Sequence, residues 1–126
     1  MGEDERELGI GIFGKVMGAD AASVRRHLAS DDFGKECTAW TTDFEFGQIW
    51  SRAGLDRRQR SCIALAMLIA LRQAEEIKAH VRIALTNGLT VEEIEEVLYM
   101  AVPYVGLPAA NTARRAMREA LKDLGK

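Results

Sequence analysis

The chain has 126 residues, of which 48% are hydrophobic, 29% charged and 6% aromatic, and its formal net charge is −2. This composition suits one folded domain, excludes an intrinsically disordered chain and gives no basic field that would hold nucleic acid. The longest apolar run, residues 62–71, is shorter than the about 20 residues of a membrane span, and the acidic start differs from a secretion signal. We expect a single cytoplasmic domain over residues 1–126 with no membrane or nucleic-acid partner.

The hydrophobic pattern is helical along the chain, and no stretch alternates long enough to form a strand. It predicts an all-α protein, a compact bundle of about six or seven helices. The first helix, over about residues 5–17, carries three glycines that each cost about 1 kcal/mol relative to alanine, so it needs tertiary or partner contacts. Asp20 is expected to cap a second helix that ends near residue 29.

A third helix is expected to open near Asp31 or Asp32 and to bury an apolar stripe at helical spacing. The stripe consists of Phe33, Cys37, Trp40 and Phe44. Asp56 then caps a fourth helix that is apolar around its whole circumference, which predicts a central position. Its alanines would allow close approach by neighbouring helices, including those of another subunit. Together with the glycine-rich first helix, this surface predicts a homo-oligomer.

The fifth and sixth helices are predicted to form a hairpin with a signal at each boundary. Gly88 supplies the left-handed stop of a helix over about residues 74–87. Thr90 and Glu93 then form a T-x-x-E capping box that opens the sixth helix. The two prolines of the chain are expected to kink the sixth helix near its end and to stand in the first turn of a seventh.

The cysteines, Cys37 and Cys62, form neither a C-x-x-C motif nor a Cys/His ligand cluster. We expect reduced thiols that act mainly as small buried hydrophobes. No metal site is predicted, because local sequence offers no third ligand to join Glu76 and His80.

Glu76 and His80 stand four residues apart on the predicted fifth helix, so their side chains are neighbours at the border of its buried stripe. A half-buried imidazole that a carboxylate orients can give or take a proton near neutral pH. The alternative is an ordinary ion pair at the margin of the core. Spacing alone does not separate the two interpretations.

The segment WSRAGLDRRQR places Trp50 beside four arginines. They are Arg52, Arg57, Arg58 and Arg60. Two of them stand in the first turn of the fourth helix, where the macrodipole disfavours cations. Either Asp56 and solvent offset this cost, or guanidinium and backbone N–H groups form a carboxylate pocket walled by Trp50. Tyr104 and Asn111 are further candidate hydrogen-bonding residues, with packing and helix surface as their alternatives.

Several of these segments, in this order, resemble the carboxymuconolactone decarboxylases of the alkylhydroperoxidase D-like superfamily. The segments are FGQIWSRAGLDRRQRS, LAMLIAL, the E-I-K-A-H of Glu76 to His80, ALTNGLTVEEIEEVL, and the Y-V-G-L-P-A-A-N of Tyr104 to Asn111. The resemblance extends from about Gly11 to the final helix. It implies an all-α fold and assembly into homo-trimers or homo-hexamers.

The redox branch of the superfamily uses C-x-x-C followed by a histidine. When His80 is superposed on that histidine, Gln73 and Glu76 stand at the cysteine positions, and neither supplies a thiolate. Sequences of the decarboxylase branch that are similar to this one carry Glu76 and His80. Val105 departs from the cysteine that many relatives have in the Tyr-Cys-Gly segment.

The resemblance implies a carboxy-lyase that converts 4-carboxymuconolactone, or a related unsaturated lactone acid, to the enol-lactone and CO2. The conjugated carbonyl of this substrate accepts the electron pair, so the reaction needs no organic cofactor and no metal. We assign proton delivery to His80, oriented by Glu76. The substrate-binding residues are expected to be Trp50, Arg52, Arg60 and Tyr104.

Two alternatives stay open at this stage. One is an alkylhydroperoxidase D-like redox protein that uses Cys62 or Cys37. The other is a non-catalytic helical oligomer that binds a small ligand.

Overall fold

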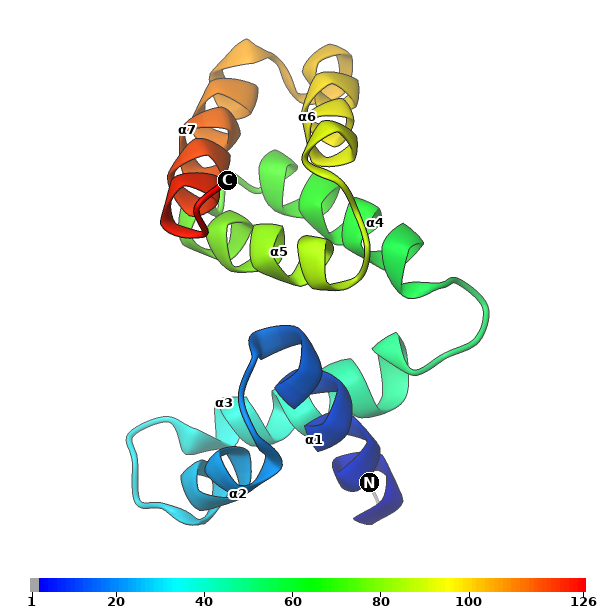
Figure 1. The fold of residues 1–126 in the computed structure, drawn as a ribbon, viewed down its shortest axis with the longest axis vertical. Coiled ribbons are helices and arrows are strands. Elements are labelled where there is room, and N and C mark those ends of the chain that lie inside the picture. The colour runs from blue at the N-terminus through cyan, green and yellow to red at the C-terminus, as the bar shows by residue number, and fades with distance from the viewer. Residues whose placement is uncertain (1–2) are drawn as a thin grey trace. The chain divides into compact units, whose positions relative to one another are not determined.

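The computed structural model describes residues 3–126, which form helices and no strand. Contacts within the chain divide it into two compact units, Met1–Leu55 and Asp56–Lys126 (Figure 1). The all-α prediction is confirmed, whereas the single domain over the whole chain stays a prediction. None of the described helices is long and apolar enough to cross a membrane.

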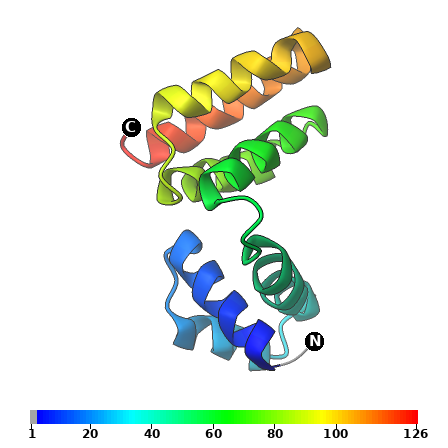
Figure 2. The ribbon, with the colours of Figure 1, turned by 90° about the vertical axis from the view of Figure 1, so that its right-hand side faces the viewer.

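The first unit consists of three α-helices and a π-helix (Figure 2). They are α1 (Glu3–Met17), α2 (Ala21–Ala29), α3 (Lys35–Trp40) and the π-helix η1 (Thr41–Trp50). As predicted, the carboxylate of Asp20 caps α2, accepting a hydrogen bond from the backbone N–H of Ser23 at 2.7 Å. Gly34 is left-handed, with φ of +74°, and α3 therefore begins after it rather than near Asp31 or Asp32.

Glycines let α1 lie directly against η1. A Cβ added at Gly9 would stand 1.6 Å from the carbonyl oxygen of Thr42, and one at Gly47 would stand 2.4 Å from that of Glu5. Only glycine fits at such a crossing, because any side chain would displace the facing backbone. As its glycine content predicts, α1 therefore depends on tertiary contacts rather than on intrinsic helix propensity.

The predicted apolar stripe of the third helix is wrong. Phe33 is fully exposed, and Trp40 and Phe44 are more than half exposed. The cause is the change from α to π geometry at Thr41, because backbone bonds from residue i to i+5 widen the turn and bring another face inward. The buried residues of η1 are Thr42, Asp43, Phe46, Gly47 and Trp50.

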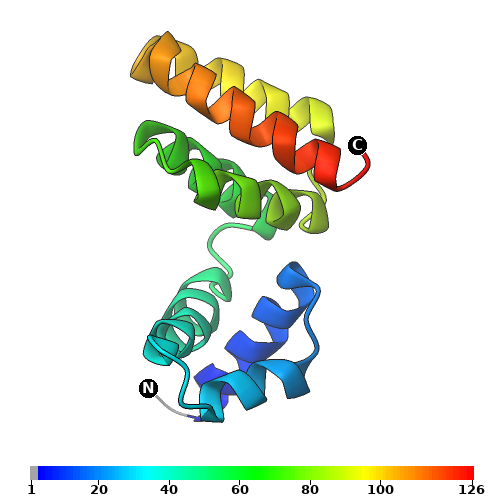
Figure 3. The same ribbon diagram turned by 90° about the vertical axis from the view of Figure 1, so that its left-hand side faces the viewer.

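The second unit consists of four α-helices in two layers (Figure 3). They are α4 (Arg57–Ala70), α5 (Ala74–Thr86), α6 (Val91–Val105) and α7 (Leu107–Asp123). The α4–α5 hairpin packs against the α6–α7 hairpin. The predicted boundaries are confirmed: Asp56 and Gln59 form a capping box, Thr90 and Glu93 form another, and Gly88 has a φ of +97°.

The core of the second unit is aliphatic and draws on all four helices. Its fully buried side chains include Leu65, Ile69, Ile77, Val81 and Ala113. Helix α7 contributes mostly alanines, as its sequence predicted, and small side chains let it pack closely on the α4–α5 layer.

Within this chain helix α4 is not enclosed on all sides, so its central position, among helices that include those of another subunit, stays a prediction. Leu65 and Ile69 are fully buried, but Met67 and Leu71, at the end of the helix, are 61% and 65% exposed. One side of the apolar helix contacts the core, and the other side faces solvent. The homo-oligomer that would cover this side stays a prediction.

Candidate active site

The predicted site residues are distributed over both units. Trp50 ends η1 in the first unit, and Arg52 follows it in the turn. The second unit holds the others on three helices. They are Arg60 on α4, Glu76 and His80 on α5, and Tyr104 near the end of α6.

A side-chain hydrogen bond fixes the register of the α4–α5 hairpin. The amide of Asn87 donates to the hydroxyl of Ser61 at 3.0 Å. The two helices run antiparallel (Figure 3), so each step back from Asn87 matches a step forward from Ser61. By this count His80 is level with Leu68. At about 1.5 Å per residue, Arg60 stands about 12 Å from His80 along the hairpin axis.

Two ion pairs join this hairpin to α6 and α7. Lys78 of α5 pairs with a glutamate of α7 at 3.1 Å, and Arg58 of α4 pairs with a glutamate of α6. His80 and Arg60 each stand two residues beyond these side chains, which is about 160° around the helix. Glu76, two residues before Lys78, lies on the same side of α5 as His80. Arg60, Glu76 and His80 therefore lie on other sides of their helices than these two ion pairs, with His80 about 60° around α5 from the fully buried Ile77. We call the side of the hairpin that carries these three residues the His80 face.

His80 is half-buried on this face, and its Nδ1 atom is shielded from solvent. Burial lowers the pKa of His80 below its ordinary 6.5, and the nearby charge of Glu76 opposes this shift only in part. A charged ion pair at the core margin would raise the pKa instead. The lowered pKa therefore disfavours the interpretation as an ordinary ion pair, which needs the charged ring.

The arginines of the first α4 turn have different environments. Arg58 donates to the carbonyl oxygen of Gly88 and to the carboxylate of Glu93, which offsets the cost of a cation at the helix N-terminus. This side chain thus joins α4 to the start of α6. Arg60 is half-buried with its Nε shielded from solvent, and Arg52 is exposed. Arg52 and Arg60 remain the candidates for binding a carboxylate.

Trp50 belongs to the core of the first unit. It is 7% exposed, and its ring centroid lies 5.6 Å from that of Phe46, which meets Phe13 at 5.7 Å. The turn after it is closed by a hydrogen bond from the Arg52 backbone N–H to the carbonyl oxygen of Ile49 at 3.1 Å. The aromatic cluster therefore supports the turn that presents the Arg52 guanidinium.

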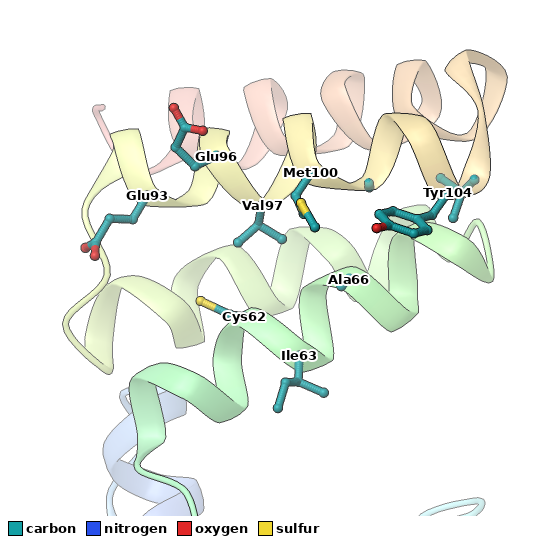
Figure 4. A pocket seen from close by; sticks show the side chains of 10 residues that line it. Cys62, Ile63, Ala66, Glu93, Glu96, Val97, Met100 and Tyr104 are labelled. Carbon is teal, nitrogen blue, oxygen red and sulfur yellow. The ribbon is translucent and has the colours of Figure 1, made fainter.

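An apolar groove of about 590 Å³ lies between α4 and α6, separate from the His80 face. Its walls come from Cys62, Ile63 and Ala66 of α4 and from Val97 and Met100 of α6 (Figure 4). Tyr104 lies at one end of this groove, and two glutamates of α6 lie at the other. The structure therefore does not bring Tyr104 together with the three residues of the His80 face.

The sequence contained a signal for this groove that the predictions did not use. In α6, Val97, Met100 and Tyr104 recur at helical spacing, and α4 is apolar on more sides than one neighbour covers. Of the two carboxylates that line the groove, Glu93 pairs with Arg58, and Glu96 would repel an anionic substrate.

The side chains for redox or metal chemistry are few. Cys37 is exposed, so its predicted burial is wrong, while Cys62 is half-buried, and both are free thiols. Burial, and then the charge of Glu93, raises the pKa of Cys62, which disfavours the reactive thiolate. Within residues 3–126, no three His, Cys, Asp or Glu side chains are grouped so that they would hold a metal ion.

Comparison with known proteins places these features in a family. Residues 35–119 match the carboxymuconolactone decarboxylase family, a span that crosses the boundary between the two units. The chain belongs to this family. The 4-carboxymuconolactone decarboxylase of Acinetobacter baylyi is 35% identical over 127 residues, which cover 99% of this chain and 93% of the relative. The nitrosuccinic acid decarboxylase of Metarhizium robertsii is 35% identical over 83 residues, which cover 66% of this chain and 58% of the relative.

The resemblance seen in the sequence is therefore confirmed. Both relatives of this carboxymuconolactone decarboxylase family member are named decarboxylases, which supports the predicted carboxy-lyase class. Their names give different substrates, so the family alone does not fix the substrate of the chain.

Proposed function

We propose that the protein is a cofactor-independent decarboxylase of a small unsaturated lactone acid, with 4-carboxymuconolactone as the first candidate. The products would be the enol-lactone and CO2. The observation that carries this proposal is the 35% identity to the Acinetobacter baylyi enzyme over 99% of the chain, a span that includes Glu76 and His80. The half-buried imidazole of His80, four residues from Glu76 on α5, gives the proposal a candidate proton donor.

The substrates in the two relatives' names both carry a group that can accept an electron pair. 4-Carboxymuconolactone has a conjugated lactone carbonyl, and nitrosuccinic acid has a nitro group. When the bond to the carboxylate breaks, the electron pair moves into that acceptor, CO2 leaves, and a proton must then be added to carbon. The protein has to hold the carboxylates, stabilise the anion and deliver the proton.

The His80 face would supply the proton. We assign proton delivery to His80, with Glu76 as the residue that orients the ring. The free imidazole is neutral at pH 7, but a substrate carboxylate bound beside it would raise its pKa, as the charge of Glu76 does in part. Substrate binding would thus create the imidazolium that protonates the dienolate.

We assign carboxylate binding to the arginines. Arg60 stands about 12 Å along the hairpin from His80, and each side chain reaches several ångström, so a small diacid would span the remaining distance. Arg52 would contribute a second guanidinium, and Trp50, from the aromatic cluster of the first unit, would support the turn that carries it. Tyr104 would add a hydrogen bond, and we expect its loss to matter least, because it lies in the acidic-ended groove.

Assembly into a homo-trimer or homo-hexamer is part of the same proposal. The exposed apolar side of α4, including Met67 and Leu71, is the surface that a second copy would cover. Sedimentation equilibrium at micromolar concentration should give a multiple of 13.9 kDa. A monomer alone would contradict this part.

Incubation of the purified protein with 4-carboxymuconolactone, with CO2 release as the readout, tests the function. We expect catalytic release, and nitrosuccinate in parallel would show whether the other relative's substrate is preferred. A Cys37→Ser, Cys62→Ser double variant should retain turnover. Tight lactone binding without CO2 would instead support a non-catalytic binder, and loss of activity in the folded double variant would support thiol chemistry.

A further inference from the structure

A bidentate ion pair joins α1 to the first turn of η1. The guanidinium of Arg6 donates from Nε to Oδ1 of Asp43 at 2.8 Å and from Nη2 to Oδ2 at 2.7 Å. Asp43 is 8% exposed. The hydrogen bond from Arg6 is the main reason that the pKa of Asp43 lies below its ordinary 3.8, so the carboxylate is ionised at neutral pH. The planar fork fixes both the separation and the orientation of the two groups.

The other contacts between α1 and η1 are less directional. Gly9 meets the Thr42 backbone, and the Phe13 ring packs on Phe46. Such packing holds the two helices together, but it does not fix the rotation of η1 about its own axis. A further polar contact, from Nε2 of Gln48 to a carboxylate oxygen of α1, is single and longer, at 3.2 Å.

The end of η1 carries residues to which the proposed function gives a role. Trp50 is the last residue of η1, and Arg52 follows in the turn. A π-helix and an α-helix of the same ten residues end in different directions, because the π turn contains more residues. A change in η1 geometry would therefore turn both side chains.

We propose that Arg6 and Asp43 are positioning residues: their ion pair holds the start of η1 on α1 and thereby places Trp50 and Arg52 for the substrate carboxylate. The part that concerns substrate rests on the proposed function. Neither Arg6 nor Asp43 needs to touch the substrate, since both act through the helix.

The chain offers a matched control one position along α1. The guanidinium of Arg25 donates to both carboxylate oxygens of Glu7 at 2.7 Å, and both side chains are half exposed. This pair has the same chemistry and joins α1 to α2 rather than to η1. Neutralising it should leave the end of η1 unchanged.

Tryptophan fluorescence reports the position of Trp50 without any turnover. Trp40 is the other tryptophan and is 60% exposed, so Trp40→Phe leaves Trp50 as the one emitter. In this background, Asp43→Asn should shift Trp50 emission to longer wavelength. It should also raise KM for 4-carboxymuconolactone about tenfold, the scale of a small misplacement, with kcat changed less than about twofold. Glu7→Gln should change none of these.

Unchanged emission in folded Asp43→Asn would overturn the proposal. Shifted emission with an unchanged KM would overturn the substrate part and, with it, the roles proposed for Trp50 and Arg52, while CO2 release by the parent would still support the function. If Asp43→Asn fails to fold, Arg6→Lys keeps a cation beside Asp43 but loses the fork. It should then show the emission shift and the raised KM. An Arg6→Lys variant that shows neither would also overturn the proposal.

Discussion

The two units of the chain are stabilised in different ways. The second unit has capping boxes at Asp56 and Thr90 and an aliphatic core to which all four helices contribute. The first unit relies on glycine contacts between α1 and η1, the partly buried ion pair of Arg6 and Asp43, and a π-helix. Local sequence signals therefore account for most helix boundaries of the second unit. The packing of the first unit depends instead on contacts between residues of different helices.

Gly9→Ala should have the largest effect, because the added Cβ would stand 1.6 Å from the Thr42 carbonyl oxygen. We expect a loss of about 3 kcal/mol or more in the free energy of unfolding, measured by urea denaturation. Gly11→Ala is the control, since an added Cβ there meets nothing within 4 Å, and it should stabilise the helix by up to about 1 kcal/mol. Equal effects of the two substitutions would show that α1 does not depend on close contact with η1.

His80→Gln tests whether the second unit supplies the chemistry. It should retain the fold and lose about 100-fold or more in kcat for lactone decarboxylation, the scale expected for a general acid. Glu76→Gln should lose less, and it should lower the pKa of His80 further by removing a negative charge.

His27→Gln is the matched control, because that ring contacts Thr38 Oγ1 at 2.9 Å within the first unit. It should leave kcat unchanged. Parental turnover by folded His80→Gln would make the imidazole structural, and Tyr104 would become the next candidate donor.

Arg52→Ala tests whether the first unit contributes to binding the substrate carboxylate. Arg52 is exposed at the end of η1, so its removal should leave the free energy of unfolding nearly unchanged. We expect KM to rise about tenfold with little change in kcat, as for a contact made equally in ground and transition states. Steady-state kinetics on the lactone would show this, and a fall in kcat alone would reverse the assignment.

The helix caps should contribute similarly in the two units. Asp20→Ala removes the cap of α2, and Thr90→Ala removes half of the α6 capping box. Each should cost about 1 kcal/mol of unfolding free energy in urea denaturation. A much larger cost for Asp20→Ala would mean that the first unit also depends strongly on local signals.

Acid should affect the two units in different pH ranges. Because burial lowers the pKa of His80, folding disfavours its protonation, and the free energy of unfolding should fall as pH drops below about 6.5. The ionised Asp43 stabilises the first unit above its ordinary pKa of 3.8, and this contribution is lost only below that pH.

Urea denaturation of the parent and of His80→Gln between pH 7 and 5.5 measures the His80 part. The substitution should flatten the pH dependence in that range. An unchanged slope would mean that His80 titrates as it does in the unfolded chain.

The sequence by itself determined the helical class, the family and most helix boundaries. Helix caps act within a few residues, so the sequence predicts them without a three-dimensional structure. The caps predicted in this way are Asp20, Asp56, Gly88 and the Thr90–Glu93 box. The spacing of Glu76 and His80 likewise placed the pair on one face of α5, because a helix has a fixed period.

Only the tertiary structure decided which apolar faces are buried. Phe33, Trp40 and Phe44 have the spacing of a buried stripe, yet the π-helix after α3 turns Phe46 and Trp50 inward instead. The lowered pKa of His80 depends on what surrounds the ring, which helical spacing does not specify. Burial is set by neighbours that are distant in the chain, whereas caps and periodicity are set by neighbours along it.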